Sequence, residues 1–139
     1  MAFQLNNTWF NLIIWYLIAA NIYTYFYYHN WTEDQENGDF DFDRIKRRFF
    51  NLMLALLFNI YCFAYLYAIP FSSNFNWVKG VSKMKSSLLF SFANSITADY
   101  APIKILNANG YNLTLLEACT SFIFLTIILS NSIPQIKEK

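Results

Sequence analysis

The sequence predicts an all-α membrane protein. Of its 139 residues, 56% are hydrophobic and 21% are aromatic, while only 14% are charged. Ordinary soluble domains are about 25% charged. The apolar residues form three long runs whose only charge is Glu117 in the third, and runs of this length are typical of helices that cross a bilayer. The net charge of +1 gives no indication of nucleic-acid binding.

The first apolar run, residues 9–28, is uncharged and about long enough to cross a bilayer core. Trp9 and Trp31 near its two ends are typical of the aromatic belts at membrane interfaces. Asn11 and Asn21 interrupt the run, which predicts that they face other helices rather than lipid. Because no basic segment precedes the run, we expect it to be retained as a span rather than removed as a signal peptide.

Residues 29–48 form a polar loop, with acidic residues first and basic residues last. Its centre is similar to an EF-hand loop, but Arg44 replaces the bidentate acid of that motif. The sequence therefore favours a solvated acidic loop, with a weak divalent-cation contact at Asp41 and Asp43 as the alternative.

The orientation in the membrane is indicated by the basic residues at 44–48, which adjoin the second run directly. Residues 29–48 and 72–112 each hold four basic residues, so a count of loop charges does not decide which loop is cytoplasmic. The cluster beside the span favours a cytoplasmic loop and C-terminus, with the N-terminus outside, in a plasma or inner membrane.

The second and third runs cover residues 49–71 and 113–133. They predict an outer helix that Pro70 closes and an inner helix that contains Glu117. Cys62 and Cys119 lie within these runs, and we expect both to be packing residues. The chain thus divides into residues 1–48, a module at 49–134 and a tail at 135–139.

A shorter helix is predicted between these runs, at residues 86–97. It is too short to span, and apolar residues surround most of it, so we expect it to pack inside protein. Ser86 or Ser87 is expected to cap its N-terminus. The partial negative charge at its C-terminal end would favour a cation beyond Thr97.

Residues 49–134 resemble the two-transmembrane potassium-channel family of pore-loop cation channels. Residues 88–91 (LLFS) are similar to its "LYFS" run, residues 96–102 (ITADYAP) align without a gap with T-T-V-G-Y-G-D, and residues 110–118 (GYNLTLLEA) are similar to G-x-x-x-T-I-L-E-G. The resemblance implies a re-entrant pore helix and filter loop between the second and third spans, and a homotetramer around one axis within the lipid bilayer.

The filter implied by this resemblance departs from the family pattern. Asp99 and Ala101 fill the two positions where glycines permit the unusual backbone of a potassium filter. Four Asp99 carboxylates would instead form a ring that, with Thr97, binds a permeant cation (K+, Na+ or Ca2+). We therefore expect a weakly selective or calcium-permeable channel rather than a strictly potassium-selective one. The alternative is a non-conducting structural or accessory subunit. The filter residues are Thr97, Ala98, Asp99, Tyr100 and Ala101.

Glu117 aligns with the inner-helix acid of that family, which implies that it braces the pore helix through Ser95 or Thr97. Lining of the ion path and an interfacial position are the alternatives. Ser121 stands where the family often has a glycine hinge. The residues expected to line an inner cavity are Phe122, Phe124, Thr126 and Ser130.

The sequence gives almost no support to an enzyme. It contains no nucleophile elbow, phosphate-binding loop or metal-binding cluster of cysteine and histidine. We expect no cofactor and no soluble substrate.

Overall fold

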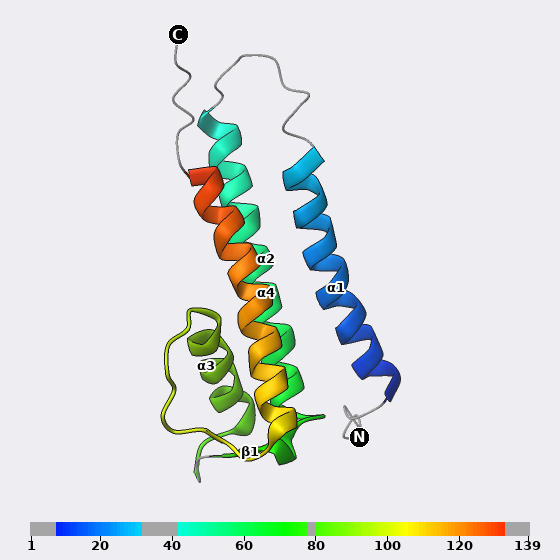
Figure 1. The fold of residues 1–139 in the computed structure, drawn as a ribbon, viewed down its shortest axis with the longest axis vertical. Coiled ribbons are helices and arrows are strands. Elements are labelled where there is room, and N and C mark those ends of the chain that lie inside the picture. Colours follow the sequence, from blue (N-terminus) through cyan, green and yellow to red (C-terminus); the bar gives the residue numbers. More distant parts are fainter. Residues whose placement is uncertain (1–7, 32–41, 78–79, 133–139) are drawn as a thin grey trace.

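The computed structural model describes residues 8–31, 42–77 and 80–132, which are mostly helical. Helices α1, α2 and α4 run side by side with alternating directions, and α3 is a shorter helix beside α2 and α4 (Figure 1). The elements are α1 (Thr8–Trp31), α2 (Phe42–Ala68), a 3-10 turn (Ser72–Asn74), β1 (Phe75–Asn76), α3 (Lys83–Ser95), β2 (Lys104–Ile105) and α4 (Ala108–Ser132).

Two of these helices are long and apolar enough to cross a membrane, over Lys46–Ala68 in α2 and Ala108–Leu129 in α4. These two predicted spans are therefore confirmed in length and composition. Helix α1 has 24 residues but is not one of the two. The tyrosines and asparagines in its sequence lower its mean hydropathy.

Helix α2 is shifted toward the N-terminus relative to the predicted 49–71. It begins at Phe42, so the basic residues at 44–48 belong to the helix and not to the preceding loop. It ends at Ala68 because Pro70 has no backbone N–H to continue the helix and disfavours helical geometry at Ile69.

Helix α4 begins at Ala108, five residues before the predicted position, because Asn107 caps it. The Asn107 side-chain oxygen accepts a hydrogen bond of 3.0 Å from the backbone N–H of Gly110. Its amide nitrogen donates to Asn74 Oδ1 at 2.9 Å. The cap therefore also fixes the start of α4 to the turn that follows α2.

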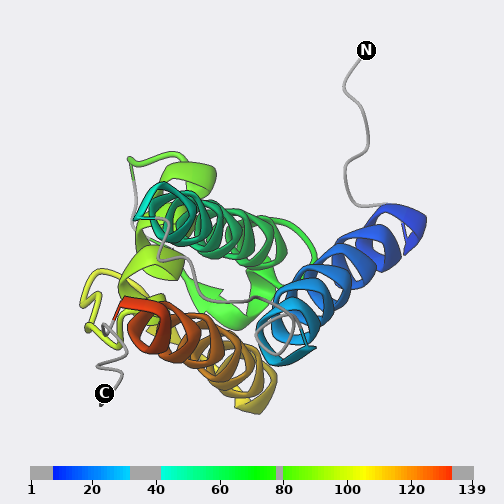
Figure 2. The ribbon, with the colours of Figure 1, turned by 90° about the horizontal axis from the view of Figure 1, so that it is seen from above.

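Helix α1 is attached to α2 through the two asparagines that interrupt its apolar run. Asn21 donates to the carbonyl of Ala55 at 3.0 Å, and Asn11 accepts a hydrogen bond of 3.2 Å from the Tyr65 hydroxyl. The prediction that both asparagines face another helix is confirmed. Seen from above, α1 lies on the opposite side of the α2 and α4 pair from α3 (Figure 2).

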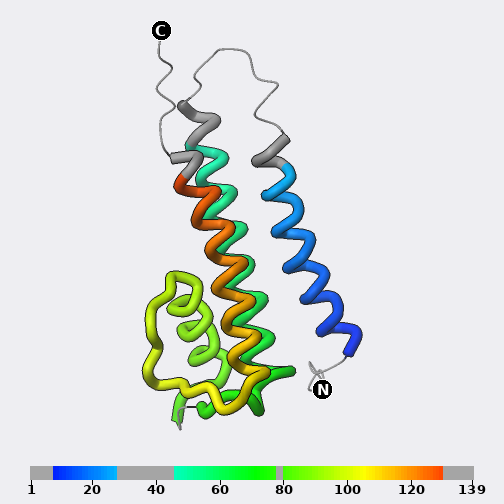
Figure 3. The backbone as a smooth tube through the Cα atoms, viewed as in Figure 1, coloured from blue at the N-terminus to red at the C-terminus, as the bar shows by residue number. Residues whose placement is uncertain are grey.

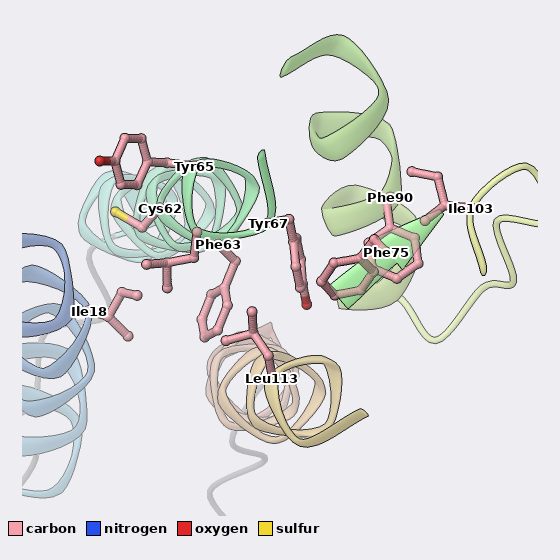
Figure 4. Close-up of a cluster of buried hydrophobic side chains, with 10 residues drawn as sticks. Ile18, Cys62, Phe63, Tyr65, Tyr67, Phe75, Phe90, Ile103 and Leu113 are labelled. Atoms are coloured by element: carbon pink, nitrogen blue, oxygen red, sulfur yellow. The ribbon is translucent and has the colours of Figure 1, made fainter. Parts of the chain in front are cut away.

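An aromatic cluster holds α2, β1 and α3 together. The ring of Tyr67 lies 5.1 Å from Phe75 and 5.1 Å from Phe90, and the latter two rings are 5.6 Å apart. All three pairs are edge-to-face, the geometry that aromatic quadrupoles prefer. Ile103, from the segment after α3, and Leu113, from α4, close the cluster (Figure 4).

The chain from β1 through α3 to β2 leaves one end of the bundle and returns to the same end. We call this helix-containing segment, residues 76–104, the hairpin. Strand β1 pairs antiparallel with β2, with Phe75 opposite Ile105 and Asn76 opposite Lys104. From this pair α3 extends partway along α2 and α4, and the following segment returns to the starting end (Figures 1 and 3). With 13 residues, α3 is about 20 Å long, shorter than a bilayer core of about 30 Å.

Candidate functional site

The predicted pore helix and filter lie in this hairpin, but the helix bounds are shifted. Helix α3 spans Lys83–Ser95 and not 86–97, and its N-cap is Ser82, which makes no side-chain capping bond. The predicted caps Ser86 and Ser87 are buried inside the helix, where the Ser87 hydroxyl donates to the Met84 carbonyl at 2.9 Å. The cap prediction was wrong because the helix begins at Lys83, so both serines lie within it and not at its N-terminus.

Helix α3 ends in a Schellman motif at the first filter residue. The N–H of Thr97 donates to the Asn94 carbonyl at 3.0 Å, and the N–H of Ala98 donates to the Ala93 carbonyl at 2.8 Å. Thr97 has a φ of 57°, the left-handed conformation that this motif requires and that glycine usually supplies. The turn satisfies two helix carbonyls and directs the chain back toward β2.

The rest of the predicted filter is largely open to the surroundings in the single chain. Thr97, Ala98, Asp99 and Ala101 are exposed, whereas Tyr100 is half-buried against the aromatic cluster. Within the described part of the chain, Thr97 is the non-glycine residue with a positive φ. The two filled glycine positions, Asp99 and Ala101, therefore keep backbone angles that ordinary residues adopt.

Behind this loop, the carboxyl group of Glu117 joins three helices. Glu117 lies on α4 and is fully buried. Its Oε2 accepts hydrogen bonds from the Tyr67 hydroxyl at 2.6 Å and the Asn94 amide at 2.7 Å, and its Oε1 is hydrogen-bonded to the Ser91 hydroxyl. Asn94 also donates to the Thr114 carbonyl at 2.9 Å. We call Tyr67, Ser91, Asn94 and Glu117 the buried polar cluster.

These partners differ from the ones that the sequence suggested for Glu117. The hydroxyl of Ser95 donates to the Phe92 carbonyl at 2.7 Å, and that of Thr97 donates to the Ile96 carbonyl at 2.7 Å. Glu117 instead contacts Ser91 and Asn94, which are three residues apart and therefore share one face of α3. That spacing could have identified both residues, but nothing in the sequence indicates Tyr67, which is one of many aromatic residues in α2.

A second polar contact joins α2 to α4 one turn further along. Asn59 donates to the Thr120 hydroxyl at 3.2 Å, and Thr120 donates in turn to the Glu117 carbonyl at 2.9 Å. Asn59 Oδ1 and Ser121 Oγ are buried without a hydrogen-bond partner. Ser121, at the position where the resembled family often has a glycine hinge, is therefore packed inside the bundle.

The residues predicted to line a cavity do not share one face of α4. Phe122 and Thr126 are exposed, whereas Phe124 is fully buried, with its ring 6.1 Å from that of Tyr25 on α1. Phe124 is thus a core residue, which corrects its prediction. The side chain of Ser130 lies outside the described residues.

The two cysteines differ in environment. Cys62 is buried in the core, as predicted, but Cys119 is exposed on α4. Both thiols are free.

The predicted divalent contact cannot be compared with the structure, since Asp41 and the side chain of Asp43 lie outside the described residues. Within the described ranges, no group of three or more His, Cys, Asp or Glu side chains could hold a metal ion.

Comparisons with protein-family models, with curated proteins and with solved structures found no match to this chain.

Proposed function

We propose that this chain is the subunit of a tetrameric pore-loop cation channel in a membrane. The observation that carries the proposal is the hairpin between Asn76 and Lys104. A helix too short to span, followed by a segment that returns to the same end, is the arrangement of a re-entrant pore loop. Backbone of this kind is tolerated at membrane depth only where protein or a water-filled path surrounds it.

The proposed arrangement has three spans, with α1 crossing beside α2 and α4. Helix α1 has the length to cross a bilayer, and Asn11 and Asn21 within it each form a hydrogen bond with α2. The start of α2 and the end of α4 lie at the end of the bundle opposite the hairpin (Figure 1). A cytoplasmic position of the basic residues at 44–48 would then put the hairpin and the N-terminus on the outside.

Asp99 is the proposed source of cation selectivity. It is exposed in the single chain, beyond the C-terminal end of α3, whose backbone carbonyls carry partial negative charge. In a tetramer, four such carboxylates around an axis would attract cations by the field of their side chains. The ordinary backbone at Asp99 and Ala101 supports weak selectivity or calcium permeation rather than a potassium filter built from carbonyl rings.

A non-conducting accessory subunit is the second candidate. The observation that favours it is the packing of Tyr100 against the aromatic cluster, because this contact keeps part of the filter segment on its own subunit. A loop held in this way could support a neighbouring protein without opening a path for ions.

Ion flux into liposomes that contain the purified chain separates the two candidates. We expect flux of potassium, sodium and calcium through the native protein, and a marked loss of calcium flux in the Asp99→Asn variant. Asn112→Lys is the matched control, because it changes the charge equally at an exposed position at the start of α4. Absence of flux with all three cations would contradict the proposal of a channel. Strict potassium selectivity would contradict the proposed filter.

A further inference from the structure

The two contacts of Ser91 bear on whether Glu117 carries a hydrogen. Its hydroxyl oxygen lies 2.8 Å from the Ile60 carbonyl and is also hydrogen-bonded to Glu117 Oε1. A carbonyl oxygen has no hydrogen, so Ser91 must donate in the first contact. A serine hydroxyl has one hydrogen. With that hydrogen directed at Ile60, a full hydrogen bond in the second contact takes its hydrogen from Glu117.

The other side of the carboxyl group is consistent with this assignment. Glu117 Oε2 already accepts from the Tyr67 hydroxyl and from one amide hydrogen of Asn94. The second amide hydrogen of Asn94 is directed to the Thr114 carbonyl. Oε2 is thus fully used as an acceptor, and Oε1 is the oxygen that can carry a hydrogen.

Among the residues that the structure describes, the side chains hydrogen-bonded to Glu117 are all uncharged. Helix α2 contributes the titratable Tyr67, whose hydroxyl is a neutral donor, and α3 contributes the neutral Ser91 and Asn94. Glu117 is fully buried, and a buried carboxylate without a cationic partner is strongly disfavoured.

We propose that Glu117 is an uncharged carboxylic acid that donates its hydrogen to Ser91. The hydrogen bonds then form one directed chain, from Tyr67 to Glu117, from Glu117 to Ser91 and from Ser91 to Ile60. This chain begins and ends on α2 and passes through α4 and α3. It joins the three helices without any net charge in the interior.

Infrared spectroscopy of the full chain in lipid bilayers tests the proposal at neutral pH. We expect the C=O stretching band of a protonated carboxylic acid in the native protein and its loss in Glu117→Gln. Absence of the band in the native protein, or its persistence in Glu117→Gln, would overturn the proposal. If the Gln variant does not fold, Ser91→Ala provides the readout, because removing the acceptor of the acid's hydrogen should shift the band.

Thermal unfolding supplies a second readout. Glutamine reproduces the proposed pattern, since its amide nitrogen can donate to Ser91 and its oxygen can accept from Tyr67 and Asn94. We expect Glu117→Gln to retain the native melting temperature and Glu117→Ala to lower it. A Gln variant as unstable as the Ala variant would contradict an uncharged Glu117.

Discussion

Thr97 has an unfavourable backbone conformation at the turn between α3 and the proposed filter. Its φ of 57° is in the left-handed region, where a β-branched side chain is crowded by its own backbone. The conformation persists because it closes the Schellman motif and satisfies the carbonyls of Asn94 and Ala93. Backbone strain of this kind is often found at functional sites.

Replacing Thr97 by glycine should therefore stabilise the protein. Glycine adopts a positive φ without a steric penalty, so we expect Thr97→Gly to raise the free energy of unfolding by about 1 kcal/mol. Chemical denaturation of the purified chain measures the change. Ala98→Gly, at the next position, should be neutral or destabilising because its φ is not positive. Equal effects of the two variants would contradict strain at Thr97.

Gly110 is the second residue at which a small change should have a large effect. A Cβ at this position would lie 2.6 Å from Ile105 Cγ2 and 3.2 Å from the Asn74 carbonyl oxygen. We expect Gly110→Ala to destabilise the chain by about 1–3 kcal/mol through overpacking. The exposed neighbour Asn109 offers a control, because Asn109→Ala adds no such contact. Equal denaturation midpoints for both variants would exclude the close approach.

At the scale of elements, the sequence predicted which segments form helices better than where those helices end. Long apolar runs, with Glu117 as their only charge, identify α2 and α4. The start of α4 could not be read from the sequence, since Asn107 acts as its cap while held by the distant Asn74. The boundaries thus depend on tertiary contacts that local patterns do not contain.

The attachment of α1 to α2 should depend measurably on Asn21. We expect Asn21→Leu to weaken that attachment by about 0.6 kcal/mol, a typical value for one hydrogen bond between helices in a membrane. Faster hydrogen–deuterium exchange along α1 would report the loss. Thr24→Leu is the control, because Thr24 is exposed on the same helix. Unchanged exchange in Asn21→Leu would exclude a stabilising role for the bond to Ala55.

The buried polar cluster could be predicted in part. Glu117 stands out in the sequence as the only acid in a long apolar run, and its contact with α3 follows from the implied family pattern. The partners of Glu117 could not be derived from the sequence. The depth of α3, meaning its position along α4, determines which turn of α3 faces the Glu117 carboxyl group. That depth is fixed by packing of the aromatic cluster around Phe90.

At the scale of the whole molecule, the proposed tetramer brings four copies of Asp99 near one axis. Asp99→Cys in a Cys119→Ala background should therefore form disulfide-linked dimers of the chain under mild oxidation. Leu12→Cys, exposed on α1, is the control and should form far fewer dimers. Denaturing electrophoresis without reductant measures both. Monomers alone from Asp99→Cys would contradict convergence of the loops.

The pairing of β1 (Phe75–Asn76) with β2 (Lys104–Ile105) has a consequence for how the protein can change. Because the strands are neighbours, the two ends of the hairpin are joined at a single stem. Helix α3 beyond this stem is held against α2 and α4 by Phe90, Ser91 and Asn94, whereas the loop that follows it, with Asp99, is mostly exposed. Closing a longer loop costs little additional entropy. The loop between α3 and β2 can therefore lengthen while the stem and the helices stay as they are.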